Sequence, residues 1–141
     1  MIELVLLGQP RGKESVRGTR DGAHHYLPEK TRDYMGALRY VAEQVMAGRP
    51  PLDGPLSLAL TLRLPIPTSK SRKWQTDARA GVIRPTRKPD WDNFGKILDA
   101  LNLVVWIDDA QIVDSTVQKF YSDRPGMWIS VRPLVSGGVF G

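Results

Sequence analysis

Leucine occupies every second position from residue 56 to residue 64, with Ser57, Ala59, Thr61 and Arg63 between the leucines. Because successive side chains of a strand point to opposite faces, this spacing predicts a strand that places all of these leucines on one face. Such a face is stable only when it is covered by other apolar groups. The chain must therefore contain a sheet with one face in a hydrophobic core.

The remaining periodicities complete an outline of the fold. We expect, in chain order, a strand over 2–7, a helix over about 34–45, the leucine strand, a helix over about 92–102, a short buried strand over 103–107, and a hairpin of strands over 111–121 and 127–134. Without the short strand over 103–107, the order β-α-β-α-β-β predicts an α+β fold, in which two main helices pack on a mixed β-sheet. The outline places residues 1–141 in a single domain, with a frayed tail over 136–141.

Composition excludes several classes of protein. The chain has 141 residues, of which 41% are hydrophobic, and it contains no cysteine. The missing cysteine excludes disulfide frameworks, thiolate zinc sites and cysteine nucleophiles, and agrees with a reducing compartment. No apolar run approaches the ~20 residues of a membrane span. We therefore expect a cytoplasmic protein with no membrane partner.

Positive charge is concentrated in one segment. Between Arg63 and Pro89 there are eight basic residues and one acidic residue, a net charge of +7 in a chain whose total is +5. Proline, serine and threonine are frequent there, so we predict a long, mobile, basic loop over 65–89. Long loops in compact domains are usually functional, and a basic one suits a polyanion. A solvated loop that only aids solubility would carry the same charge.

Acidic residues follow this segment directly. On a helix from about residue 92, Asp92, Lys96 and Asp99 share one face, opposite an apolar face, and Asp90 lies just before the helix. Asp108 and Asp109 follow the predicted short strand. Singly, these residues have simpler explanations: an aspartate N-cap, an i,i+4 surface pair, or a turn. Together they indicate a site where several carboxylates converge.

Converging carboxylates repel one another, and a divalent cation is the usual reason to assemble them. Oxygen donors without cysteine favour Mg²⁺, with Mn²⁺ as a possible substitute. Such an ion polarises a phosphoryl oxygen and activates water, and Lys96 is placed to stabilise the charge that develops on the phosphate. The pattern therefore predicts metal-assisted phosphodiester hydrolysis. Of the nearby tryptophans, we expect Trp91 and Trp106 in the core and Trp74 as a candidate for base stacking.

The run from Lys88 to Tyr121 resembles the RusA family of Holliday junction resolvases, which are endodeoxyribonucleases common in phages and prophages. The family pattern is approximately Lys-Pro-Asp-x-Asp-Asn-x-x-Lys, Asp-Ala-Leu-Asn and Asp-Asp-x-Gln-Ile/Val, followed by a lysine. These motifs correspond here to residues 88–96, 99–102, 108–112 and Lys119. The opening motif departs from the family at Lys13–Arg17, and Leu103 replaces a frequent glycine.

The resemblance implies roles for individual residues. It makes Asp90, Asp92 and Asp109 the metal-binding catalytic carboxylates and Lys96 the catalytic lysine, with Asn93 and Asp108 in support. Phosphate contacts are expected from the following basic residues: Lys13, Arg17, Lys70, Arg72, Lys73, Arg84, Arg87 and Lys88.

The expected function is therefore Mg²⁺-dependent resolution of four-way and related branched DNA by paired cleavage. Symmetric cuts in two strands need two active sites, so we also expect a homodimer with two-fold symmetry. Two alternatives stay open at this point: a non-catalytic, structure-selective DNA-binding module, and a general metal-dependent nuclease.

Overall fold

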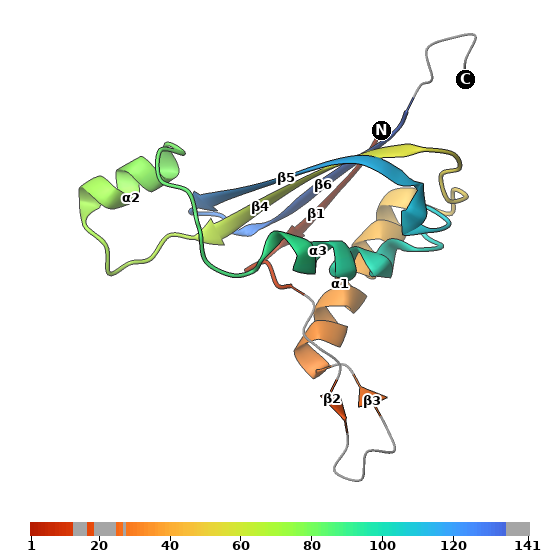
Figure 1. The fold of residues 1–141 in the computed structure, drawn as a ribbon, viewed down its shortest axis with the longest axis horizontal. Helices are drawn as coiled ribbons and strands as arrows, with labels where there is room; N and C mark the ends of the chain where they lie inside the picture. The colour runs from red at the N-terminus through yellow and green to blue at the C-terminus, as the bar shows by residue number, and fades with distance from the viewer. Residues whose placement is uncertain (13–16, 19–24, 27, 135–141) are drawn as a thin grey trace.

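The computed structural model describes residues 1–12, 17, 18, 25, 26 and 28–134 (Figure 1). Its elements are β1 (Ile2–Leu7), β2 (Arg17–Gly18), β3 (His25–Tyr26), α1 (Glu29–Met46), β4 (Leu56–Pro65), α2 (Arg72–Arg79), α3 (Trp91–Ile97), the 3-10 helices η1 (Leu98–Leu101) and η2 (Asp109–Gln111), β5 (Ile112–Ser122) and β6 (Gly126–Pro133).

The main sheet has four strands in the order β1-β6-β4-β5. β4 runs parallel to β5 and antiparallel to β6, and β6 is antiparallel to β1. Parallel neighbours require a crossover connection, and the chain between β4 and β5 supplies it through α2, α3 and η1. The predicted α+β fold with a mixed sheet is confirmed.

The leucine strand lies in the middle of this sheet. All five of its leucines are buried, and they pack with Leu38 of α1 and with Phe94 and Ile97 of α3 in one hydrophobic core. α1 ends at Met46 because Ala47 adopts a left-handed conformation, with a φ of 50°, before the glycine and prolines that follow. The predicted end of this helix is thus confirmed, whereas its start at Glu29 lies more than one turn before the predicted residue 34.

The predicted hairpin of β5 and β6 is wrong. Both strands form close to the expected residues, but β4 lies between them and pairs with each. The short Asp123–Pro125 connection passes the end of β4 instead of closing a two-stranded ribbon. The turn residues between the two strands favour a hairpin. The leucine strand instead takes a hydrogen-bonded neighbour on each side, β5 and β6, and this central position in the sheet buries its leucines.

The predicted strand over 103–107 is also wrong. These residues form turns with isolated bridges, including one from Leu52 to Trp106. Trp106 is completely buried, as predicted, and its Nε1 donates a hydrogen bond of 2.6 Å to Asn102 Oδ1. Leu103 has a φ of 68°, in the left-handed region that favours glycine, and its side chain is exposed. The buried apolar run is thus a compact turn centred on Trp106.

The basic segment is not a continuous loop, because it contains α2. Ser71 caps this helix by accepting a hydrogen bond from the Trp74 amide at 3.2 Å. Arg, Lys, Gln and Ala have high helix propensity even without an apolar stripe, which explains why periodicity did not reveal the helix. An ion pair of 2.7 Å between Arg79 and Asp123 ties α2 to the connection after β5. The mobility of 65–89 stays a prediction, and the tail over 136–141 lies outside the described residues.

Candidate active site

The start of α3 presents two of the predicted carboxylates to solvent. Asp90 occupies the N-cap position with extended backbone geometry, and its carbonyl accepts a hydrogen bond of 3.1 Å from the Asn93 amide. Asp90, not Asp92, is thus the cap residue, and its side chain makes no capping hydrogen bond. Phe94 is buried behind this turn, which fixes its orientation. The Asp90 and Asp92 carboxylates are therefore exposed on a rigid turn.

Lys96 lies one turn further along the same exposed side of α3. No ion pair within 4.0 Å joins Lys96 to Asp92 among the described residues, so the i,i+4 surface pair that was the simpler alternative for these two residues does not form. An exposed ammonium that is not neutralised by this neighbour can meet a phosphate.

Trp91, between the two carboxylates, is 73% exposed. Its predicted place in the core is wrong. It is the first residue of α3, and the buried side of this short helix is formed by Phe94 and Ile97 instead.

Lys119 of β5 holds the segment that leads into α3. Its Nζ donates hydrogen bonds to the carbonyl of Arg87 and, at 3.0 Å, to the carbonyl of Pro89. Burial lowers the pKa of Lys119, and the nearby Asp90 carboxylate opposes that shift. Lys119 belongs to the family pattern, but the pattern alone indicates no role for it, so sequence reasoning missed its place beside Asp90.

The other carboxylates gather at the far end of the α3–η1 segment. The Asp109 carboxyl is hydrogen-bonded to Asp108 and Asp99, and these contacts, together with burial, raise its pKa to about 6. Adjacent carboxylates cannot all ionise cheaply, so Asp109 keeps its proton to a higher pH than an isolated aspartate does. Asp99 is thus a neighbour of Asp109 that the predicted site left out, although it lay on the predicted acidic face.

Asp108 serves the backbone around Asp109. It caps η2, where its Oδ1 accepts a hydrogen bond of 3.3 Å from the Ala110 amide. Gln111 completes a capping box by accepting a hydrogen bond of 2.9 Å from the Asp108 amide, and it also donates to the carbonyls of Leu52 and Gly54. These contacts fix the position of Asp109.

The two groups of carboxylates remain apart. Within the described ranges, no three acidic or histidine side chains surround one point closely enough to hold a metal ion. Asp109 contacts Asp99, which follows Asp92 by seven positions, or ~10 Å along a helix. The donor atoms of both groups are carboxylate oxygens, and this type of donor fits a hard divalent cation.

Asn93 supports the start of α3 through the N-terminal loop. A Cβ added at Gly12 would lie 2.8 Å from the Asn93 Cβ and 3.3 Å from the Pro89 Cβ. Gly12 thus allows the loop before the opening motif to pack tightly on this turn. Of the predicted phosphate contacts in that motif, Lys13 and the Arg17 side chain lie outside the described residues.

Two basic side chains of the 63–89 segment pack on aromatic rings of β5. The Arg84 guanidinium lies 3.7 Å from the centre of the Phe120 ring, and its Nε donates a hydrogen bond of 2.6 Å to the Lys119 carbonyl. Arg87 lies over Tyr121 at 5.9 Å and donates to the Pro65 carbonyl. These contacts fix both guanidiniums beside the segment that enters α3.

The other predicted cations are arranged more loosely on α2 and near it. Trp74 packs on Tyr121 with ring centres 5.3 Å apart, and Lys70 lies over Trp74. Trp74 therefore anchors α2 to β5, and its candidate role in base stacking has no support in the structure. Lys73 forms an exposed ion pair of 3.6 Å with Asp77, while Arg72 and Lys88 are exposed.

Comparison with known families decides the class of enzyme. Residues 8–132 match the family described as Endodeoxyribonuclease RusA. The chain belongs to this RusA family. The match spans the basic segment, both carboxylate groups and the sheet, so the resemblance found in the sequence is confirmed. RusA proteins are endodeoxyribonucleases that act on branched DNA, which supports a nuclease over a non-catalytic binding module.

One relative covers almost the whole chain. It is the uncharacterized protein YqaN of Bacillus subtilis strain 168, which is 36% identical over an alignment of 140 residues that covers 94% of this chain and 96% of that protein. In the part of the chain that the structure describes, no helix is long and apolar enough to cross a membrane.

Proposed function

We propose that this RusA-family protein is a Mg²⁺-dependent endodeoxyribonuclease that resolves four-way DNA junctions by paired cleavage, acting as a homodimer. The observation that carries the proposal is the start of α3. There, two exposed carboxylates lie at the first turn and Lys96 lies one turn further along the same exposed side, directly after a segment whose arginines contact aromatic rings. Metal-dependent phosphodiester cleavage needs carboxylates that bind a metal ion and, next to them, basic side chains that bind phosphates.

Each group has a distinct task in this proposal. Asp90, Asp92 and Asp109 would hold Mg²⁺, which when bound polarises a phosphate oxygen and lowers the pKa of a water molecule. Mn²⁺ would substitute for Mg²⁺, since both ions accept oxygen donors. Lys96 would donate to a non-bridging phosphate oxygen as negative charge develops. Arg84 and Arg87 would bind flanking phosphates and align the scissile bond.

Two further residues would keep these groups in place. Lys119 would position Asp90 through the carbonyls that it binds, and Asp108 would position Asp109 through the cap of η2. Because Asp99 contacts Asp109, it would set how strongly Asp109 retains a proton until a cation arrives.

The test uses purified protein with a synthetic four-way junction and a linear duplex of the same sequence. We expect cuts at symmetric positions in two opposed strands of the junction, only when Mg²⁺ or Mn²⁺ is present, and little cutting of the duplex. Binding without cleavage under every metal condition would reject the enzyme, and equal cleavage of both substrates would favour a general nuclease.

A further inference from the structure

Trp91 differs from the other three tryptophans in having no structural task in the fold. Trp74 packs on an aromatic ring of β5, Trp106 is completely buried, and an arginine guanidinium lies 4.2 Å from the centre of the Trp128 ring. Trp91 is 73% exposed, and its indole has no aromatic, cationic or hydrogen-bonding partner within the part of the chain that the structure describes. Because an indole is large and mostly apolar, tryptophan is largely buried in most proteins. The exposed ring of Trp91 is thus a candidate binding surface.

α3 places this ring beside the residues of the candidate active site. Asp90 precedes Trp91 and Asp92 follows it, and successive residues of a helix are turned by about 100°. Trp91 and Gly95 therefore form one row on the exposed side of α3, next to the row formed by Asp92 and Lys96. A nucleotide whose phosphate reaches the second row carries its base towards the first.

Gly95 leaves the surface next to the indole bare. A Cβ added at Gly95 would have no heavy atom within 4 Å beyond its chain neighbours and the helix backbone, and Gly95 has no positive φ. Glycine is unfavourable inside a helix, and neither close packing nor backbone conformation requires it here. The glycine thus provides open space in the row that contains Trp91.

We propose that Trp91 stacks on a DNA base at the branch point, next to the phosphate that is cut; this role deepens the proposed function and rests on it. Every base has an aromatic face, so stacking on an indole requires no particular sequence. In a continuous duplex both faces of each base are covered, and uncovering one costs unstacking energy. Around an open branch point, base pairs lack a stacking neighbour on one side. Trp91 therefore favours a junction over a duplex.

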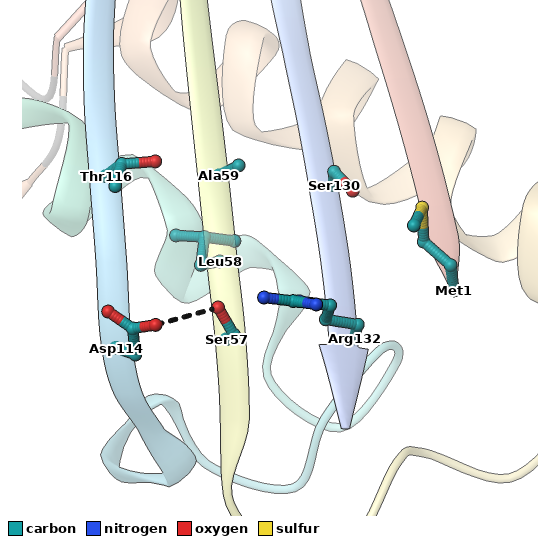
Figure 2. A pocket seen from close by; sticks show the side chains of 8 residues that line it. All are labelled: Met1, Ser57, Leu58, Ala59, Asp114, Thr116, Ser130 and Arg132. Atoms are coloured by element: carbon teal, nitrogen blue, oxygen red, sulfur yellow. Dashed lines mark hydrogen bonds between the residues drawn. The ribbon is translucent and has the colours of Figure 1, made fainter. Parts of the chain in front are cut away.

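Other described surfaces do not present such a ring. Figure 2 shows the hollow on the sheet face opposite the leucines, and none of its eight lining side chains is aromatic. The acidic side chain there, Asp114, already accepts a hydrogen bond of 3.3 Å from Ser57 Oγ. Tyr40 is also exposed, but it belongs to α1, which carries none of the candidate site residues. Trp91 is therefore the described aromatic ring that is placed to meet DNA at the site.

Binding to a synthetic four-way junction and to a linear duplex tests this role, with Ca²⁺ in place of Mg²⁺ so that the DNA stays intact. We expect Trp91→Ala to bind the junction about 10-fold more weakly, because one base loses its stacking partner, and to bind the duplex within about 2-fold of wild-type protein. Trp91→Phe should keep most of the junction affinity, whereas Trp91→Leu, which is apolar but has no ring, should resemble Trp91→Ala. Tyr40→Ala is the matched control and should bind both substrates as wild-type protein does.

Photochemical crosslinking of wild-type protein locates the contact directly. 5-Iodouracil at the branch point bonds to an aromatic side chain that stacks on it when the complex is irradiated. We expect the crosslinked peptide of the junction complex to carry the modification on Trp91, and no crosslink to Trp91 in the duplex complex.

Wild-type junction affinity of Trp91→Ala, equal losses of affinity for junction and duplex, or a junction crosslink to another residue would each overturn the proposal. A changed sedimentation mass of Trp91→Ala would also overturn it, because the ring would then be a contact between protein chains. Binding in Ca²⁺ does not depend on cleavage. A wild-type protein that crosslinks through Trp91 but never cuts the junction in Mg²⁺ would therefore count against the proposed function alone.

Discussion

The two ends of the α3–η1 segment carry similar acidic residues in opposite states. At its start, Asp90 and Asp92 are exposed, and cations line the approach to them. At its end, Asp109 contacts both Asp108 and Asp99, and these contacts and burial raise the pKa of Asp109 to about 6. The difference shows that carboxylates at the two ends of this segment have different roles. Those at its start are free to bind a ligand, whereas those at its end contact other carboxylates.

The largest expected effect is at the available end. Asp92→Asn removes a charge from the proposed metal site, and we expect it to lower the single-turnover rate of junction cleavage by about 100-fold or more. Junction affinity should change little, because phosphate contacts come from the basic residues. The exposed Asp33→Asn on α1 is the matched control. Asp92→Asn protein that cuts at the wild-type rate would remove this end from the mechanism.

The next largest effect is expected from Lys119, whose hydrogen bonds hold the segment that leads into α3. Lys119→Met leaves the carbonyls of Arg87 and Pro89 without their donor, and we expect a loss of about 2 kcal/mol in the free energy of unfolding, measured in urea. Lys119→Arg should recover part of this loss because it keeps a charged donor. Unchanged stability of both variants would mean that Lys119 does not fix the segment.

The contacts among the carboxylates around Asp109 predict that removing the charge of Asp109 stabilises the protein. Because the pKa of Asp109 is raised in the folded protein, its ionisation costs stability as the pH rises from about 4 through 6. With allowance for solvent screening, Asp109→Asn should stabilise the metal-free protein by about 1 kcal/mol at pH 7 and by much less at pH 4. Thermal unfolding at both pH values measures this, and a pH-independent difference would contradict proton sharing.

The smallest expected effect on stability comes from the turn between η1 and η2, which contains Leu103. Leu103→Gly relieves a left-handed backbone at an exposed side chain, and we expect a gain of about 0.5 kcal/mol, seen as a rise of one or two degrees in Tm. The neighbouring Ile107→Gly, which is also exposed but has no positive φ, is a control that should not gain stability.

Periodicity predicted the elements that bury apolar faces. The β1, α1 and β4 segments were recognised because alternate or helical spacing is imposed by the core itself. Pairing of β5 with β6 was predicted wrongly, since turn residues indicate a local chain reversal and do not show that β4, from earlier in the chain, lies between the two strands. α2 was missed because Trp74 and Ala78 are its only apolar residues, which is too few to show a helical period.

The residues of the candidate site were recoverable from motifs, but their grouping was not. Asp90, Asp92 and Asp109 were named from spacing and family pattern, and the exposure of Asp90 and Asp92 agrees with a ligand role. Which carboxylates meet depends on the rise of the helix and on the cap of η2, and neither is visible in a list of aspartates. The pairing of Asp109 with Asp99 is therefore a result of three-dimensional structure.

The central claim is that Asp109 and the carboxylates at the start of α3 serve one metal-dependent cleavage reaction. The most direct measurement is the Mg²⁺ dependence of single-turnover junction cleavage by wild-type protein and by Asp109→Asn. We predict that Asp109→Asn needs at least about 10-fold more Mg²⁺ for half-maximal rate and is slower at saturation. An Mg²⁺ dependence and maximal rate equal to those of wild-type protein would contradict the claim.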